Sequence, residues 1–193
     1  MDVEQRVRDL FKESVRAKEA FREDEGCVRA VSSAAEAIAG CLKRGGQILV
    51  FGNGGSAADS QHLAAELVVR FESDRKALPC ISLNVNNSVL TAAGNDYSFE
   101  EIFSRQIEAL GRPGDIAFAI STSGNSPNVT KGARAAREKG LKVISLTGKS
   151  GGALAALSDI AVIAPSEVTA RIQEVHITAI HAICKLVEEA FTK

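Results

Sequence analysis

Residues 47–56 read QILVFGNGGS, a short and continuous apolar run followed at once by a glycine-rich loop. A continuous run of this length predicts a strand that is buried on both faces, because a half-exposed strand would alternate apolar and polar residues. Four more short apolar runs follow along the chain, at residues 78–83, 115–120, 142–146 and 159–163. The sequence therefore predicts five buried strands of one parallel sheet.

Segments with helical periodicity separate these runs, at residues 56–71, 87–93, 99–110, 126–139 and 152–157. Two amphipathic helices, 2–25 and 27–43, come before the first strand, and a long helix, 169–191, closes the chain. Alternating strands and helices indicate a three-layer α/β/α fold with right-handed crossovers, of the flavodoxin-like kind. No linker or low-complexity stretch divides residues 1–193, so we expect a single domain.

Composition argues against several classes of function. The 193 residues include 23 Lys and Arg against 24 Asp and Glu, a formal net charge of −1, so we expect no nucleic-acid partner. No apolar stretch approaches the roughly 20 residues that span a bilayer, and the charged N-terminus is unlike a signal peptide, so we expect a cytoplasmic protein with no membrane partner. Four separated cysteines, without a CxxC pair, are expected to be buried thiols: Cys27, Cys41, Cys80 and Cys184.

Two loops of similar composition follow predicted strands and precede predicted helices. The first is GNGGS at residues 52–56, and the second is STSGNS at residues 121–126. Glycines let the backbone approach a ligand, and hydroxyls beside the start of a helix bind phosphate without adding charge. Neither loop ends in the GK[ST] of a nucleoside-triphosphate site, so a sugar phosphate suits them better. Either loop alone is equally explained as a turn with a helix cap, but two of them at the carboxyl ends of neighbouring strands favour a ligand site.

Two histidines lie near other side chains that bind metals. His62 and Glu66 are four residues apart in one predicted helix, so they share a face of it. Gln173 and His181 are eight residues apart in the last helix, about 12 Å along its axis, so spacing alone is weak evidence for a shared ion. His176 points to another side of that helix, and we expect a packed histidine.

Other polar groups have simpler interpretations. Asn95 and Asp96 follow a predicted short helix and are typical of a turn. Arg171 is expected to form an ion pair. Asp59, as a charge on the surface of a helix, is expected to be solvated.

Four blocks of sequence resemble the phosphoheptose isomerases, a branch of the sugar isomerase (SIS) domain family: GNGGSAADSQHLAAEL at residues 52–67, NDYSFEEIFSRQ at 95–106, STSGNSPNV at 121–129 and ARIQEVHITAIH at 170–181. The resemblance covers essentially the whole chain and implies an SIS-type fold. It implies conversion of sedoheptulose 7-phosphate to D-glycero-D-manno-heptose 7-phosphate through an enediol, the first step towards ADP-heptose and the heptose of lipopolysaccharide core. It also implies a homotetramer that uses the leading helices (residues 1–44) in assembly and shares active sites between subunits, with one zinc ion per subunit.

The resemblance also implies roles for individual residues. Zinc would be bound by His62, Glu66, Gln173 and His181. Glu66 resembles the catalytic base of the family and His181 its acid, and Asp59 matches a polar residue that assists. The sugar would contact Asn53, Gly54, Gly55, Asn95, Asp96, Glu66 and Gln173. The phosphate would be held by Ser121, Thr122, Ser123 and Ser126, joined by Ser56, which would also cap its helix. Ala170 departs from the family pattern, because some members have an acidic residue beside the arginine that matches Arg171.

Other functions stay open at this point. A non-catalytic SIS-domain protein that binds a replication initiator has similar loops, but the intact His181 argues against it, since that branch lacks the last histidine. An isomerase of another sugar phosphate, such as arabinose 5-phosphate, usually carries an additional regulatory domain. A sugar-phosphate sensor would carry a DNA-binding domain. We expect 193 residues to leave no room for either addition.

Overall fold

The computed structural model describes residues 2–192 and contains one parallel sheet of five strands. The strands are β1 (Ile48–Gly52), β2 (Cys80–Ser82), β3 (Ile116–Ser121), β4 (Lys142–Gly148) and β5 (Ile160–Ala164). Their order across the sheet is β2-β1-β3-β4-β5, which confirms the predicted flavodoxin-like arrangement. After β1 the chain forms β2 at one edge of the sheet, and it then crosses back to form β3 on the opposite side of β1. Such sheets bind ligands at this change of direction, beside the carboxyl ends of β1 and β3.

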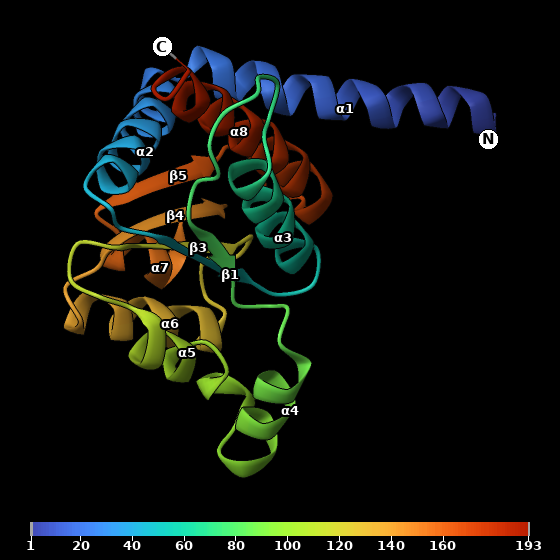
Figure 1. Ribbon diagram of the computed structural model, residues 1–193. Coiled ribbons are helices and arrows are strands. Elements are labelled where there is room, and N and C mark those ends of the chain that lie inside the picture. Colours follow the sequence, from blue (N-terminus) through green and yellow to red (C-terminus); the bar gives the residue numbers. More distant parts are fainter. Residues whose placement is uncertain (1, 193) are drawn as a thin grey trace.

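Helices cover both faces of the sheet, as Figure 1 shows. One face is covered by α2 (Glu25–Lys43), α3 (Gly55–Val68) and α8 (Thr169–Glu189). The other face is covered by α4 (Asn87–Asp96), α5 (Ser104–Leu110), α6 (Pro127–Glu138) and α7 (Gly152–Leu157). This places α3 and α8, which carry the predicted metal ligands, in the same layer.

Successive residues of the central strands point to opposite layers. In β1, Ile48 and Val50 pack with the layer of α2, α3 and α8, whereas Leu49 and Phe51 pack with the opposite layer. All five residues of β1 are buried. The continuous apolar runs therefore reflect burial on both faces, as the sequence predicts.

Several predicted boundaries are wrong, among them the end of the helix predicted at residues 56–71, which the structure places at Val68. The helix predicted at residues 99–110 is divided into a 3₁₀ turn, η1 (Phe99–Glu101), and α5. The Ser104 hydroxyl bonds to both the backbone carbonyl and the carboxylate of Glu101, and such side-chain bonds compete with a regular helix. The second strand is shorter than the apolar run at 78–83. Helix α4 extends through Asp96, so residues 95 and 96 are helical rather than a turn.

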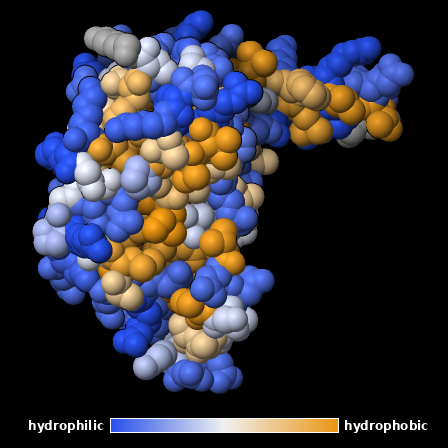
Figure 2. Space-filling view, viewed as in Figure 1, coloured by the Kyte–Doolittle hydropathy of each residue, from blue (hydrophilic) through white to orange (hydrophobic). Residues whose placement is uncertain are grey.

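Helix α1 (Val3–Glu23) projects from the body of the molecule (Figure 1). Its C-terminal part is anchored, because Ala17 is buried and Phe21 packs on the core. Its outer part has a row of exposed apolar side chains, visible in Figure 2 as the orange stripe: Val3, Val7, Leu10, Phe11 and Val15. Phe11 is 71% exposed. An exposed apolar row of this kind marks a surface for association.

The prediction of four buried thiols holds for three of the cysteines. Cys41, Cys80 and Cys184 are buried free thiols, as predicted, but Cys27 is only half-buried. Among the helices of residues 2–192, we find none with the length and apolar character needed to cross a bilayer.

Candidate active site

Three side chains from two neighbouring helices meet in one place. His62 and Glu66 lie on α3, and His181 lies on α8, which packs beside α3. The Nε2 atoms of His62 and His181 are 2.9 Å apart, and Nε2 of His62 is 3.2 Å from Oε1 of Glu66. The side chain of His62 is 42% exposed and that of Glu66 is 21% exposed, so a small ligand has access to this His62–Glu66–His181 cluster.

The cluster has the donor atoms of a zinc site. One ligand atom from each residue lies within 4.8 Å of the other two. Two ligands at about 2.0–2.1 Å from a tetrahedral zinc ion lie about 3.3 Å from each other. The observed separations of 2.9 Å and 3.2 Å are close to that spacing. Imidazole nitrogen and carboxylate oxygen are both ligands that zinc accepts, so these residues fit a metal ion.

Gln173 lies near the start of α3 rather than beside the two histidines. Its side-chain amide packs against Gly55, the first residue of α3, and a β-carbon at that position would collide with it. A larger residue at position 55 would displace the Gln173 amide from this contact. Gln173 precedes His181 by about 12 Å along α8, so its role as a fourth metal ligand stays a prediction.

The glycine loop after β1 leads directly into α3. Gly54 is the N-cap of α3 and has a φ of +56°, a left-handed conformation that favours glycine. The prediction that Ser56 caps this helix is wrong. Ser56 occupies the second helical position, is buried, and donates its backbone N–H to the carbonyl of Asn53 at 2.9 Å.

Asn53 joins the two predicted ligand loops. Its Nδ2 donates to Oδ1 of Asn128 at 2.8 Å, and Nδ2 of Asn128 donates back to Oδ1 of Asn53 at 2.9 Å. Asn128 lies in the first turn of α6 and is 2% exposed. This reciprocal amide pair fixes the glycine loop after β1 to the helix that follows the serine loop.

The hydroxyl residues of the second loop gather where β3 ends and α6 begins. The Oγ atoms of Ser121 and Ser126 are 3.0 Å apart, and Oγ of Ser123 accepts the backbone N–H of Asn125 at 3.2 Å. Ser126 is the N-cap of α6, but its side chain makes no capping hydrogen bond. Thr122 and Ser123 are partly exposed. The loop therefore presents hydroxyls at a helix start, beside the point of the sheet at which ligands are expected.

Asp59 is less solvated than the sequence predicts. Its Oδ2 atom is buried and has no hydrogen-bond partner within residues 2–192. Burial raises the pKa of Asp59 to about 6, although the charge of His62, one turn further along α3, opposes the rise. A carboxyl group with this pKa exchanges protons near neutral pH, which suits an assisting role in proton transfer.

His176 belongs to the core, as predicted. It is fully buried, and its Nε2 lies 2.8 Å from the backbone carbonyl of Thr147. Burial lowers the pKa of His176 to about 4, so the ring is neutral at physiological pH. Arg171 forms the expected ion pair, with Glu174 at 2.7 Å.

A single chain does not bring the whole predicted site together. Asn95 and Asp96 are exposed on α4, across the sheet from α3 and α8, and bond to each other at 2.8 Å. Glu66 lies about 16 Å along α3 from Gly55, at about 1.5 Å per residue. The cluster, the two linked loops and the pair at 95–96 are therefore three separate groups within one chain.

Sequence reasoning missed two asparagines that organise the loops. Asn84 donates to the carbonyl of Gly52 at 2.8 Å and accepts the N–H of Gly52 at 3.2 Å, which holds the end of β1. Asn84 directly follows the apolar run at residues 78–83, and a polar residue at the carboxyl end of a predicted strand indicates a position near the ligand loops. Asn128, the partner of Asn53, lies inside the STSGNSPNV block without being singled out.

Comparison with known proteins gives consistent matches. The sequence profile of the SIS domain matches residues 11–148. The phosphoheptose isomerase of Shewanella pealeana is 51% identical over 93% of this chain and 92% of its own length. The phosphoheptose isomerase of Aquifex aeolicus is 50% identical over 96% of both.

Solved structures agree with the sequence matches. The phosphoheptose isomerase of Neisseria gonorrhoeae superimposes with a TM-score of 0.91 at 45% identity and covers 97% of this chain and 99% of its own. That of Francisella tularensis superimposes with a TM-score of 0.93 at 38% identity and covers 98% and 100%. The fold, the His62–Glu66–His181 cluster and these matches have one common explanation: the chain belongs to the phosphoheptose isomerases of the SIS domain family.

Proposed function

We propose that this chain converts sedoheptulose 7-phosphate to D-glycero-D-manno-heptose 7-phosphate, the first step towards the heptose of lipopolysaccharide core. The observation that carries the proposal is the meeting of Glu66 and His181 from two different helices, with His62 between them. A carboxylate beside imidazoles is the arrangement that an aldose–ketose isomerase needs, because the reaction moves protons between neighbouring carbon and oxygen atoms.

Glu66 acts as the base in this proposal. Its carboxylate removes a proton from C1 of the ketose, and His181 donates a proton to the oxygen at C2 as the enediol forms. The proton held by Glu66 then passes to C2, while His181 takes up the hydroxyl proton at O1 and the aldehyde forms. The number of protons is unchanged, and the substrate is rearranged without an external oxidant. Asp59 assists by exchanging protons at the edge of this pair.

The same cluster is proposed to hold zinc, one ion per subunit. His62, Glu66 and His181 are ligands, and Gln173 is the fourth by its match to the family pattern. A zinc ion supplies Lewis-acid polarisation of the substrate oxygens. Because a metal-bound carboxylate is a weaker base than a free one, the two roles of Glu66 compete.

The loops are proposed to bind the rest of the substrate. The phosphate group accepts hydrogen bonds from the hydroxyls of Ser121, Thr122, Ser123 and Ser126, with Ser56 nearby. The sugar contacts Asn53, Gly54, Gly55, Asn95 and Asp96. The absence of a lysine within the serine loop suits a monoester held by hydroxyls and helix N–H groups.

We propose a homotetramer in which neighbouring subunits complete one site. Two observations support it. Glu66, the proposed base, lies about 16 Å along α3 from Gly55, and His62 lies about 10 Å from it, so a single small substrate would not span Glu66 and the glycine loop of one chain. The outer part of α1 leaves an apolar row exposed, and a second copy of the chain would cover it.

The direct test is turnover of sedoheptulose 7-phosphate by the purified, zinc-supplemented protein, followed by the anomeric proton signals of the aldose in NMR. We expect the aldose to accumulate to equilibrium. Arabinose 5-phosphate, assayed in parallel, tests the alternative substrate, and faster turnover of it would replace the heptose proposal. No turnover of either sugar with zinc present would favour the non-catalytic, initiator-binding alternative.

A further inference from the structure

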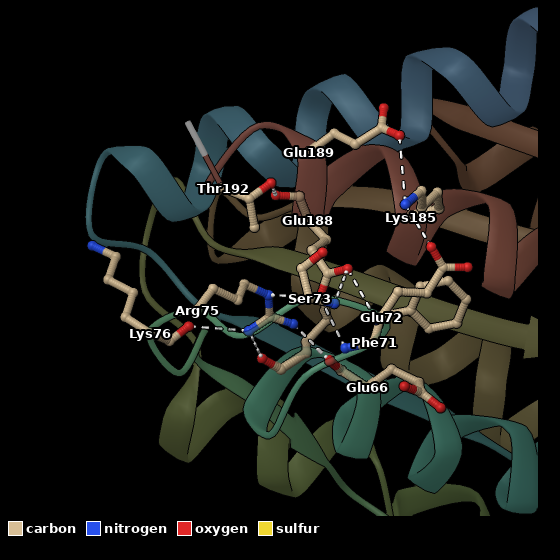
Figure 3. Close-up of polar contacts among 11 residues, drawn as sticks. Glu66, Phe71, Glu72, Ser73, Arg75, Lys76, Lys185, Glu188, Glu189 and Thr192 are labelled. Atoms are coloured by element: carbon tan, nitrogen blue, oxygen red, sulfur yellow. Dashed lines mark hydrogen bonds and ion pairs between the residues drawn. The ribbon is translucent and has the colours of Figure 1, made fainter.

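A buried ion pair lies beside the last turn of α3, between α8 and the segment at residues 69–79 that follows α3 (Figure 3). Nε of Arg75 is 3.5 Å from Oε1 of Glu188, and each side chain is 1% exposed. Two charges are removed from water here, which is costly unless each has further partners. Arg75 and Glu188 both have further hydrogen-bond partners. Through these partners the pair contacts the backbone of Glu66, the proposed base, and the residue that packs against His181, the proposed acid.

Glu188 holds the segment after α3 by three consecutive backbone N–H groups. Phe71 donates to Oε1, and Glu72 and Ser73 donate to Oε2, all at 2.9 Å. Burial by itself would raise the pKa of Glu188, but these three donors and the Arg75 guanidinium hold the pKa below its usual range. Glu188 is therefore a carboxylate that fixes the path of residues 71–73.

Arg75 holds the end of the helix that carries Glu66. Its Nη2 donates to the backbone carbonyl of Glu66 at 2.7 Å, and its Nη1 donates to that of Leu67 at 2.8 Å. Helix α3 ends at Val68, so the last carbonyls lack their usual helical donors. The two arms of the guanidinium supply donors to both carbonyls at once and fix the last turn of α3.

The same pair also acts on His181. The ring of Phe71 lies against that of His181, with centroids 5.7 Å apart and planes inclined by 38°. The N–H of Phe71 is one of the three groups that Glu188 holds. Glu188 thus sets the residue that packs against the proposed acid, while Arg75 sets the backbone of the proposed base.

We propose that Arg75 and Glu188 are positioning residues, which hold Glu66 and His181 at the separation that proton transfer and metal binding need. The inference rests on the proposed function for its kinetic part only. In a purely structural role, the pair would only stabilise the packing of the segment at residues 69–79 against α8. The two roles predict different results for a variant that lacks the pair but is still folded: only a positioning role predicts a loss of kcat and metal affinity.

Arg75→Met is the main variant, because it leaves Glu188 with its three backbone donors and removes the guanidinium from the Glu66 and Leu67 carbonyls. Arg75→Lys keeps the positive charge, but its single ammonium group does not reproduce the planar guanidinium that donates to both carbonyls. Lys185→Met is the matched control, since Lys185 also joins α8 to this segment, through an exposed pair with Glu72.

Three quantities are measured at a temperature well below the unfolding midpoint of every variant. They are kcat and KM for sedoheptulose 7-phosphate, and the affinity of the metal-free protein for Co²⁺ from its absorption spectrum. Loss of a group that orients a metal ligand typically costs about 10-fold to 100-fold in affinity or activity. We expect Arg75→Met to lower both kcat and Co²⁺ affinity about tenfold with KM within about twofold of wild type. Arg75→Lys should recover thermal stability but not kcat, and Lys185→Met should match wild type.

A folded Arg75→Met protein with wild-type kcat and wild-type Co²⁺ affinity would overturn the inference, whatever its unfolding midpoint. Full recovery of kcat by Arg75→Lys would also overturn the inference, since a positive charge without the two-armed guanidinium would then be sufficient for normal catalysis. A wild type that binds Co²⁺ but does not isomerise the substrate would refute the proposed function only, and the Co²⁺ affinities of the variants would still decide the positioning role. A wild type that does neither would overturn both.

Discussion

The amide pair between Asn53 and Asn128 gives a prediction whose magnitude follows from the structure. Asn128→Leu keeps the branched shape of asparagine, with two larger methyl groups. It removes both hydrogen bonds of the pair, of 2.8 Å and 2.9 Å, and the bond that Oδ1 accepts from the Val129 N–H at 2.9 Å. Each bond contributes about 0.5–1.5 kcal/mol net, so the loss of three bonds should cost about 1.5–4.5 kcal/mol of unfolding free energy. Asn53→Ala removes only the two bonds of the pair and should cost about 1–3 kcal/mol, because it also leaves Nδ2 of the 2% exposed Asn128 without its partner.

The assay is a double-mutant cycle on urea unfolding, with all proteins at one concentration. Both substitutions remove the two bonds of the pair, so the double variant should lose at least about 1 kcal/mol less than the sum of the single variants. Asn87→Leu, at an exposed position on α4, serves as the control and should be near neutral. Asn128→Leu should also raise KM several-fold, although Asn128 has no proposed contact with substrate. Additivity within about 0.5 kcal/mol would refute the idea that this pair joins the two loops.

Three further predictions concern the phosphate, pH and assembly. Ser123→Ala with Ser126→Ala should raise KM at least tenfold, since each lost charge-assisted bond is worth about 1.5–3 kcal/mol; an unchanged KM would place the phosphate elsewhere. The folded chain holds the Asp59 proton more tightly than the unfolded chain, because burial raises the pKa from 3.8 to about 6, so wild-type stability falls as the pH rises through that window. Metal-free Asp59→Asn should therefore be more stable than wild type at pH 8, by about 1–2 kcal/mol in denaturant unfolding, and the difference should vanish below about pH 4. Val7→Ser with Phe11→Ser should dissociate the proposed tetramer in sedimentation, whereas a tetramer that stays intact in this variant would show that the α1 row is not an interface.

The sequence predicts the sheet well because burial on both faces leaves a simple pattern. The run at residues 47–51 has no polar side chain after Gln47, and β1 is fully buried. The two loops were predicted from the same logic, since parallel strands end at one edge of the sheet. Four-residue spacing on a helix was enough to pair His62 with Glu66.

The sequence does not predict contacts that depend on how helices and loops pack. His181 meets His62 only because α8 lies beside α3, and spacing within α8 says nothing of this. Asp59 is one turn before His62 and looks like a surface charge, yet its buried oxygen depends on the surrounding tertiary structure. Arg75 and Glu188 are distant in sequence and have no motif, so their pairing follows from the fold alone.

The central claim is that Glu66 is the base of the isomerase, and it is tested most directly by kcat of Glu66→Gln for sedoheptulose 7-phosphate. The substitution keeps the size of the side chain and removes its basicity. Proton transfer by a positioned side chain contributes about 10² to 10⁴-fold, so kcat should fall at least about 100-fold in a folded, zinc-supplemented protein. A variant that is folded to the same extent as wild type and has near-normal kcat would contradict the account.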